Sequence, residues 1–221
     1  MRSDGVIYEG EVKGCYLAIR QDNTSNASFY KDVLHIRSEA FTKSLGVKIT
    51  PDEAMTIYDA YSYLFCLYVN EEPAVSLTVT FARDGKLDCE EFYPTELIDR
   101  YRNVTGSAGK LCAVNKYECE INRFAHILTY QVWNYVYNRG IRLDIMNAKE
   151  GLMSKYYLRM GYMLVENSLF IHPKWQTHSH VFLLPADSTI NSHFKDIFKK
   201  GQDDLSINEI SKYVRLTNKI R

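Results

Sequence analysis

The sequence predicts an α/β protein in which helices cover a sheet that combines hairpins with one or two crossover connections. Short stretches of strand length are rich in apolar and aromatic residues, whereas longer stretches place apolar residues at helical spacing. The predicted order is strand, helices, two strands, short helix, strand, helix, strand, helix and two strands, with a helical tail. This order fits neither a doubly wound Rossmann domain nor a β-sandwich. The chain has no G-x-G-x-x-G or Walker-type loop to bind a nucleotide.

The first elements follow from residue spacing and turn signals. Residues 14–22, GCYLAIRQD, are predicted to form a strand. Residues 26–46 place apolar residues at roughly helical spacing and end at Gly46, where a helix C-cap is expected. Residues 61–69 and 74–81 flank the turn signal Asn-Glu-Glu-Pro and are predicted to pair as an antiparallel hairpin.

The middle of the chain predicts a short helix at 93–103, a loop TGSAGK, and a long strand at 111–124. The later elements alternate between strand and helix, with two tail helices: helix 128–140, strand 141–147, helix 150–161, strands 162–171 and 180–186, helices 193–201 and 206–216. We expect one domain over residues 1–187, with residues 188–221 as a C-terminal helical extension packed on it.

The predicted strand 111–124 carries two charged residues between apolar ones. Its apolar residues occupy odd positions up to Ile121, but Phe124 is even, so the apolar phase slips by one. A β-bulge near Asn122 would produce this slip and place Glu120 and Arg123 on the same face. The alternative is a surface ion pair that contributes at most about 1 kcal/mol.

Composition excludes several classes of protein. Lys plus Arg equals Asp plus Glu, 27 against 27, so net charge gives no attraction to nucleic acid or acidic membranes. The five cysteines are odd in number, scattered and without a C-x-x-C pair: Cys15, Cys66, Cys89, Cys112 and Cys119. Reduced thiols in a cytoplasmic protein are therefore expected. The N-terminal segment has no apolar h-region, and no apolar run is long enough to span a bilayer.

Several histidines and one cysteine are weighed against structural roles. His172, His178 and His180 lie close in sequence but without an acid or cysteine near them, so no metal site is predicted. His126 could be a second base, but a position at the start of a helix is the favoured interpretation, because a lone histidine is seldom catalytic without an orienting partner. Cys119 falls on the apolar face of its strand and is expected to pack in the core.

From about residue 29 to 185, the sequence resembles the acyl-homoserine-lactone autoinducer synthases and the N-acyl amino acid synthases, both branches of the GNAT fold. Their signature E-I-S-R-F/L-A-V is similar to E-I-N-R-F-A-H, with Glu120 and Arg123 on the charged positions. Their Arg-x-x-x-Phe helix pattern is similar to RSEAFTKSLG, which contains Arg37 and Phe41. The shorter motifs Tyr58-Asp59, YYLRMGY at 156–162 and IHP at 171–173 occur in matching order.

The resemblance implies a GNAT-like three-layer α/β fold with a mixed, mostly antiparallel central sheet. It implies an N-acyltransferase that takes an acyl group, expected to be fatty, from an acyl-carrier-protein or coenzyme A thioester, with no permanently bound cofactor and no metal. The acceptor would be the amine of an amino acid or a similar small molecule. Acyl-carrier protein would be the donor partner, with no nucleic acid partner and no membrane span.

The resemblance also implies roles for individual residues. Glu120 would be the base that deprotonates the amine, with Arg123 positioning it or binding an acceptor carboxylate. Backbone N–H groups freed at the bulge near Asn122 would stabilise the oxyanion. Tyr157 would give a proton to the departing thiolate. The implied substrate-binding residues are Arg37, Phe41, Asp59, Asn122 and Phe124, of which Arg37 and Asp59 would lie at the acceptor end. Core packing is the alternative for Tyr157, and a surface pair with an acid is the alternative for Arg37.

Three departures from the family pattern narrow these expectations. Val47 stands where the autoinducer synthases have Trp, and Thr78 is the nearest match to an Arg on their hairpin. Both differences favour a simple amine over S-adenosylmethionine. The connection FAHILTYQ has no glycine to accommodate a pyrophosphate, which favours an acyl-carrier-protein donor over coenzyme A. An acetyl-coenzyme A-dependent acetyltransferase and a catalytically silent binding or regulatory module stay open as alternatives.

Overall fold

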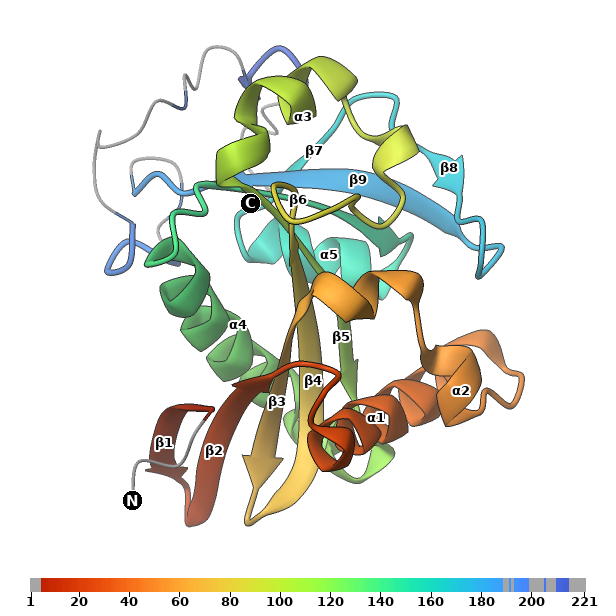
Figure 1. Ribbon diagram of the computed structural model, residues 1–221, viewed down its shortest axis with the longest axis vertical. Helices are drawn as coiled ribbons and strands as arrows, with labels where there is room; N and C mark the ends of the chain where they lie inside the picture. The colour runs from red at the N-terminus through yellow and green to blue at the C-terminus, as the bar shows by residue number, and fades with distance from the viewer. Residues whose placement is uncertain (1–4, 189–190, 192, 199–204, 206–209, 215–221) are drawn as a thin grey trace. The chain divides into compact units, whose positions relative to one another are not determined.

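The computed structural model describes residues 5–188, 191, 193–198, 205 and 210–214 (Figure 1). The chain divides into two compact units. The first comprises Met1–Thr80 and Lys110–Tyr135, and the second comprises Phe81–Gly109 and Val136–Arg221. Within the described residues, no helix is both long and apolar enough to cross a membrane.

The first unit contains four antiparallel strands in the order β1-β2-β3-β4. These strands are β1 (Val6–Val12), β2 (Cys15–Asp22), β3 (Tyr63–Val69) and β4 (Glu72–Phe81), whose last residue belongs to the second unit. Asn70 and Glu71 join β3 to β4 with φ of 49° and 71°, the left-handed conformation that tight hairpins need. The predicted strand 14–22 and the predicted hairpin are confirmed.

Helix α1 (Ala27–Leu45) begins at Asn26, whose side chain accepts a hydrogen bond from the Phe29 amide. It ends at Gly46, which has a φ of 72° that only glycine adopts freely, so the predicted helix and its cap are confirmed. Two short helices follow it: α2 (Pro51–Ala54) and the 3-10 helix η1 (Ile57–Tyr61). Buried residues of α1 form a cluster with residues of β3 and of the segment 112–114, which fixes α1 against the sheet: Phe29, Val33, Ile36, Leu64, Cys66, Tyr68, Cys112 and Val114.

The second unit is built around β6 (Leu143–Lys149) and β9 (His178–Pro185), which pair antiparallel over their whole lengths. The short strands β7 (Met163–Leu164) and β8 (Phe170–Ile171) both pair antiparallel with β9. Strand β5 (Thr105–Ala113), which has residues in both units, runs parallel to β6. The ladder between them contains two residue pairs, Thr105 with Leu143 and Gly106 with Asp144.

Helices α3 (Thr95–Tyr101) and α5 (Leu152–Arg159), with the 3-10 helices η2 (Glu90–Phe92) and η3 (Arg102–Val104), complete the second unit. Its core joins the strands, α3 and the segment 210–214: Ala82, Leu87, Tyr93, Leu97, Ile98, Tyr101, Leu143, Ile145, Val165, Val181, Leu183, Ile210 and Val214. The strand pairings named here are antiparallel except that of β5 with β6. The predicted mixed, mostly antiparallel sheet with flanking helices is therefore confirmed.

The predicted strand 111–124 is wrong. Strand β5 ends at Ala113, the 3-10 helix η4 covers Asn115–Glu120, and helix α4 runs from Ile121 to Tyr137. The three-residue step from Ile121 to Phe124 is therefore a helical repeat and not a bulged strand, and it continues to the buried Leu128. The segment TGSAGK, predicted as a loop, is the first part of β5. The prediction missed this strand because its small residues show no alternation of apolar and polar side chains.

Two other predictions differ from the structure. The predicted strand 162–171 is interrupted between β7 and β8, where Asn167 has a φ of 55° that a regular strand cannot accommodate. The predicted helix 193–201 is described only over 193–198, which form turns. The predicted helix 206–216 lies largely outside the described residues, and its residue Val214 bridges Val165. The division at residues 187 and 188 stays a prediction.

Candidate functional site

Arg37 is completely buried on the sheet-facing side of α1. Its Nη1 lies 2.7 Å from Asp59 Oδ2 and its Nη2 lies 3.1 Å from Asp59 Oδ1, so the guanidinium grips the carboxylate with two parallel bonds. Nη2 also donates to Thr78 Oγ1 at 2.6 Å. Its buried Nε has no hydrogen-bond partner among the described residues. Arg37 is therefore a buried, paired charge and not part of a surface ion pair. Its role in substrate binding stays a prediction.

Asp59 lies in η1, where hydrogen bonds from the N-cap residue of η1 and from a residue of α1 hold its carboxylate. Its Oδ2 accepts hydrogen bonds from the Thr56 amide at 3.1 Å and from the Tyr30 hydroxyl at 3.0 Å. Burial alone would raise the pKa of Asp59, but the Arg37 guanidinium, Lys110 and the Thr56 N–H together hold it below its usual value. Burial and the neighbouring Asp59 carboxylate raise the pKa of Tyr30 to about 12. Asp59 is therefore a fixed anion.

Lys110 adds a second cation to this group. Its ammonium acts electrostatically on Asp59 and lies 5.9 Å from the centre of the Tyr58 ring. Lys110 has a φ of 54°, so β5 deforms at this residue instead of continuing as a regular strand. Two cations therefore act on one buried carboxylate.

Glu120 and Arg123 lie where η4 passes into α4, one helical turn apart. Arg123 Nη1 is 3.6 Å from Glu120 Oε2, and the side chains are 29% and 50% exposed for Arg123 and Glu120 respectively. Because Asn122 is helical and exposed, the predicted bulge and its freed N–H groups do not exist there. The strand that precedes α4 is β5, TGSAGKLCA, which has no carboxylate. The role of Glu120 as a base stays a prediction.

The remaining predicted residues pack against neighbours. Phe41 is half-buried, one turn beyond Arg37 on α1, and packs on the cluster formed by α1 and β3. Phe124 is buried and meets the ring of Tyr117 edge-on at 5.8 Å. In the second unit, Tyr157 of α5 is buried against the Tyr162 ring at 5.2 Å. Its role as a proton donor stays a prediction.

Asp144, at the point where the ladder between β5 and β6 stops, is a buried acid that sequence reasoning missed. Its Oδ1 accepts the Ala108 amide at 2.8 Å and its Oδ2 accepts the Tyr162 hydroxyl at 2.6 Å. Desolvation raises its pKa to about 6, despite the opposing effect of these two hydrogen bonds. Asp144 replaces the strand partner that Ala108 lacks beyond the ladder. The sequence offered one signal for this residue, namely an acidic side chain between the apolar residues of a predicted strand.

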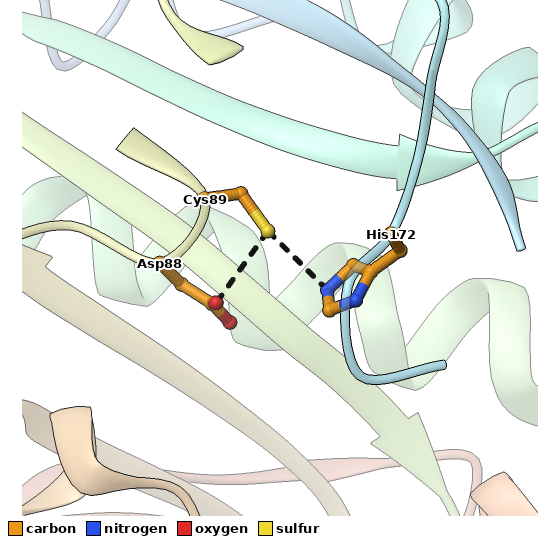
Figure 2. Close-up of side chains that lie close together, drawn as sticks. All are labelled: Asp88, Cys89 and His172. Atoms are coloured by element: carbon orange, nitrogen blue, oxygen red, sulfur yellow. Dashed lines mark hydrogen bonds between the residues drawn. The ribbon is translucent and has the colours of Figure 1, made fainter. Parts of the chain in front are cut away.

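Asp88, Cys89 and His172 form a second unpredicted group (Figure 2). Cys89 Sγ lies 3.5 Å from His172 Nε2 and 3.6 Å from Asp88 Oδ1. Cys89 and His172 are buried, and Asp88 is half-buried. The prediction of no metal site assumed that His172 had no acid or cysteine nearby, but the fold brings both from 83 and 84 residues away. Spacing along the chain gave no signal for this group.

The fold of this chain was compared with those of known proteins. No protein-family model and no curated sequence matches the chain. Among solved structures, FeeM, an N-acyl amino acid synthase from uncultured soil microbes, has 12% identity and a TM-score of 0.63, covering 81% of this chain and 97% of FeeM. The AHL synthase LasI has 10% identity and a TM-score of 0.62, covering 86% and 98%.

A probable acetyltransferase of the GNAT family from Chromobacterium violaceum has 10% identity and a TM-score of 0.52, covering 84% of this chain and 93% of its own. Identities this low establish similarity of fold and leave activity open. The protein therefore has the GNAT-like fold shared by autoinducer synthases, N-acyl amino acid synthases and GNAT acetyltransferases.

Proposed function

We propose that this protein is an N-acyltransferase that moves a fatty acyl group from a thioester to the amine of an amino acid or a similar small acceptor. The observation that carries the proposal is the contact between Arg37 and Asp59. Family motifs nominate both residues for the acceptor end, although 22 residues separate them. Their contact inside a GNAT-like fold supports that common role.

The acceptor end favours a small molecule that carries a carboxylate. Arg37 and Lys110 are two cations that both act on Asp59, so an acceptor carboxylate at this end would lie near cationic side chains. An amino acid brings that carboxylate and an ammonium that must lose a proton before it attacks the thioester carbonyl. Glu120 is the base in this proposal, and Tyr157 gives a proton to the departing thiolate. The donor is acyl-carrier protein in the cytoplasm, with coenzyme A as the alternative.

The test is acylation of free amino acids by the purified full chain, with long-chain acyl-carrier protein and acyl-coenzyme A as separate donors. Product formation is followed by mass spectrometry of N-acyl amino acids. Arg37→Lys keeps the charge but loses the two-point grip, so we expect KM for the acceptor to rise roughly tenfold or more. Arg20→Lys, on the exposed side of β2, is the matched control and should leave KM unchanged. Unchanged KM in Arg37→Lys would remove this residue from acceptor binding.

Glu120→Gln tests the catalytic role of the carboxylate separately from its contribution to folding. Loss of turnover with intact binding of the acceptor is the expected result, and full turnover would exclude Glu120 as the base. The second candidate, a catalytically silent binding module, is favoured by the half-exposed ion pair of Glu120 with Arg123. Failure of both donors with all amino acids tested, in a folded protein, would favour that candidate.

A further inference from the structure

We propose that Asp88, Cys89 and His172 form a binding site for Zn²⁺ or a similar transition-metal ion, independent of the acyltransferase function. The three side chains come from the turn before η2 and the segment that follows β8, and Figure 2 shows their polar atoms converging. Their ligand atoms all lie within 4.8 Å of one another.

The two distances from Cys89 Sγ match those between the ligands of tetrahedral zinc. Bonds of about 2.3 Å to sulfur and about 2.0 Å to nitrogen or oxygen, at tetrahedral angles, place the ligand atoms about 3.5 Å apart. Cys89 Sγ lies 3.5 Å from His172 Nε2 and 3.6 Å from Asp88 Oδ1. The ligand atoms of Asp88 and His172 lie within 4.8 Å of each other, so they must approach somewhat for one ion to contact all three side chains. A fourth position is then left for water or another ligand.

The chemistry of the three ligands favours zinc over magnesium or calcium. A thiolate and an imidazole are ligands of borderline-soft ions, whereas Mg²⁺ and Ca²⁺ prefer oxygen. The Asp88 carboxylate and the Cys89 thiolate together neutralise a divalent ion. Neutrality matters because Cys89 and His172 are buried, where a net charge would be costly.

The backbone at Cys89 provides an independent observation. Cys89 has a φ of 60° and a ψ of 28°, the left-handed conformation that residues other than glycine adopt rarely. Such strained residues cluster at ligand-binding sites, because the surrounding structure must hold them in place. Here the conformation directs Cys89 Sγ between Asp88 and His172.

Ion binding requires a change in the protonation and hydrogen bonding of the His172 ring. Its Nδ1 accepts hydrogen bonds from the amides of Lys174 at 3.2 Å and Trp175 at 3.4 Å. In the neutral ring, Nε2 therefore carries the proton and donates it towards Cys89 Sγ. Binding transfers the ring proton to Nδ1 and releases the thiol proton of Cys89. Because a protonated Nδ1 no longer accepts, ion binding requires the turn that contains Lys174 and Trp175 to release both amide hydrogen bonds.

The experiment titrates the chelator-treated, reduced full chain with Co²⁺, a spectroscopic substitute for Zn²⁺. We expect one equivalent to produce a thiolate-to-cobalt charge-transfer band, Zn²⁺ to displace it, and Mg²⁺ to leave it unchanged. Cys89→Ser should abolish the band. Asp88→Asn should weaken binding at least about tenfold, as loss of even outer-shell groups does. Cys15→Ser and His178→Gln are the matched controls and should bind normally.

Two further measurements keep the proposal falsifiable if Cys89→Ser folds poorly. At the same Zn²⁺ concentration, the thermal midpoint should rise more in the parent protein than in Asp88→Asn, because stabilisation follows the affinity of the folded state for the ion. Nitrogen NMR should show the proton of the His172 ring moving from Nε2 to Nδ1, with shifts at the Lys174 and Trp175 amides. Absence of a saturable band, an unchanged affinity for Co²⁺ in Asp88→Asn, or an unchanged ring tautomer at saturating Zn²⁺ would overturn the site.

Discussion

Asp59 in the first unit and Asp144 in the second are both buried carboxylates, yet their pKa values move in opposite directions. The pKa of Asp59 lies below its usual value, and that of Asp144 rises to about 6. Both carboxylates accept a tyrosine hydroxyl and a backbone N–H. The difference is Arg37, a cation fixed against Asp59, whereas the interactions described for Asp144 are hydrogen bonds alone. Burial alone therefore disfavours the ionised acid, and a fixed cation reverses that effect.

The largest expected effect is removal of that cation. Arg37→Met leaves Asp59 as a buried charge without its partner, and we expect a loss of about 3–5 kcal/mol in the free energy of unfolding at pH 7. Urea unfolding measures it. The control is Arg20→Met, where the exposed guanidinium lies 5.1 Å from the Tyr68 ring centre and contributes about 1 kcal/mol or less. Equal losses in the two variants would mean that the Arg37–Asp59 pair is not energetically buried.

In Arg37→Met, the pKa of Asp59 should shift in the same direction as that of Asp144. Without Arg37, desolvation dominates, so the pKa of Asp59 should rise above its usual value. Asp59 would then favour the folded state at low pH, and the loss caused by Arg37→Met should shrink as the pH falls from 7 to 4. A loss that stays constant over this range would contradict the role given to the guanidinium. Unfolding curves at several pH values, compared with the parent, provide the measurement.

The next effect is the pH dependence contributed by Asp144. Its folded pKa of about 6 exceeds the unfolded value of 3.8, so the folded protein retains a proton that the unfolded chain has lost. This stability is fully present below pH 3.8 and is lost as the pH rises through 6, by up to about 3 kcal/mol. Asp144→Asn cannot titrate. Relative to the parent, the variant should therefore gain up to that amount between pH 4 and pH 7.

Asp59→Asn gives the matched comparison with the opposite sign. The lowered pKa of Asp59 adds stability above its unfolded pKa, and this stability disappears as the pH falls through the folded pKa. The parent should therefore gain stability over Asp59→Asn as the pH rises. The measurement is the free energy of unfolding of the parent minus that of each variant, as a function of pH. If this difference changes with pH in the same direction for Asp59→Asn and Asp144→Asn, the opposite pKa shifts of the two acids are contradicted.

A smaller effect comes from the hydroxyl that supports Asp144. Tyr162→Phe removes a 2.6 Å hydrogen bond to Oδ2, which contributes about 1.5–3 kcal/mol when the acceptor is charged. The loss should be larger at pH 8, where Asp144 is ionised, than at pH 5, where a neutral acid retains a weaker bond. Unfolding of the same variant at the two pH values provides an internal control. Equal losses would indicate that Asp144 does not change its charge between them.

The contrast between these acids also explains how much the sequence could predict. Elements with their own period, such as α1 and the β3–β4 hairpin, were predicted because apolar spacing and caps are local properties. Strand β5 was missed because small residues and glycines show no alternation. Helix α4 was started too late because Ile121 and Phe124 fit a bulged strand and a helix equally well.

The candidate site divides in the same way. Arg37 and Asp59 were nominated by motifs, but their contact depends on packing of η1 against α1. Asp144 depends on where the pairing of β5 with β6 stops, and the Cys89–His172 contact joins residues 83 apart. No local pattern encodes such distances, since they arise from the packing of segments far apart in sequence and, for Asp144, from the register of two strands.

The smallest expected effect concerns Glu120, which contrasts with both buried acids. Its carboxylate is half exposed and 3.6 Å from Arg123, so Glu120→Gln should change the free energy of unfolding by less than about 1 kcal/mol. Urea unfolding at low and high salt measures it, and the small difference should vanish at high salt. A larger loss would place Glu120 in a buried network that its position at the start of α4 does not provide. Because the folded state tolerates this change, any loss of acyl transfer in Glu120→Gln reports on the chemistry and not on folding.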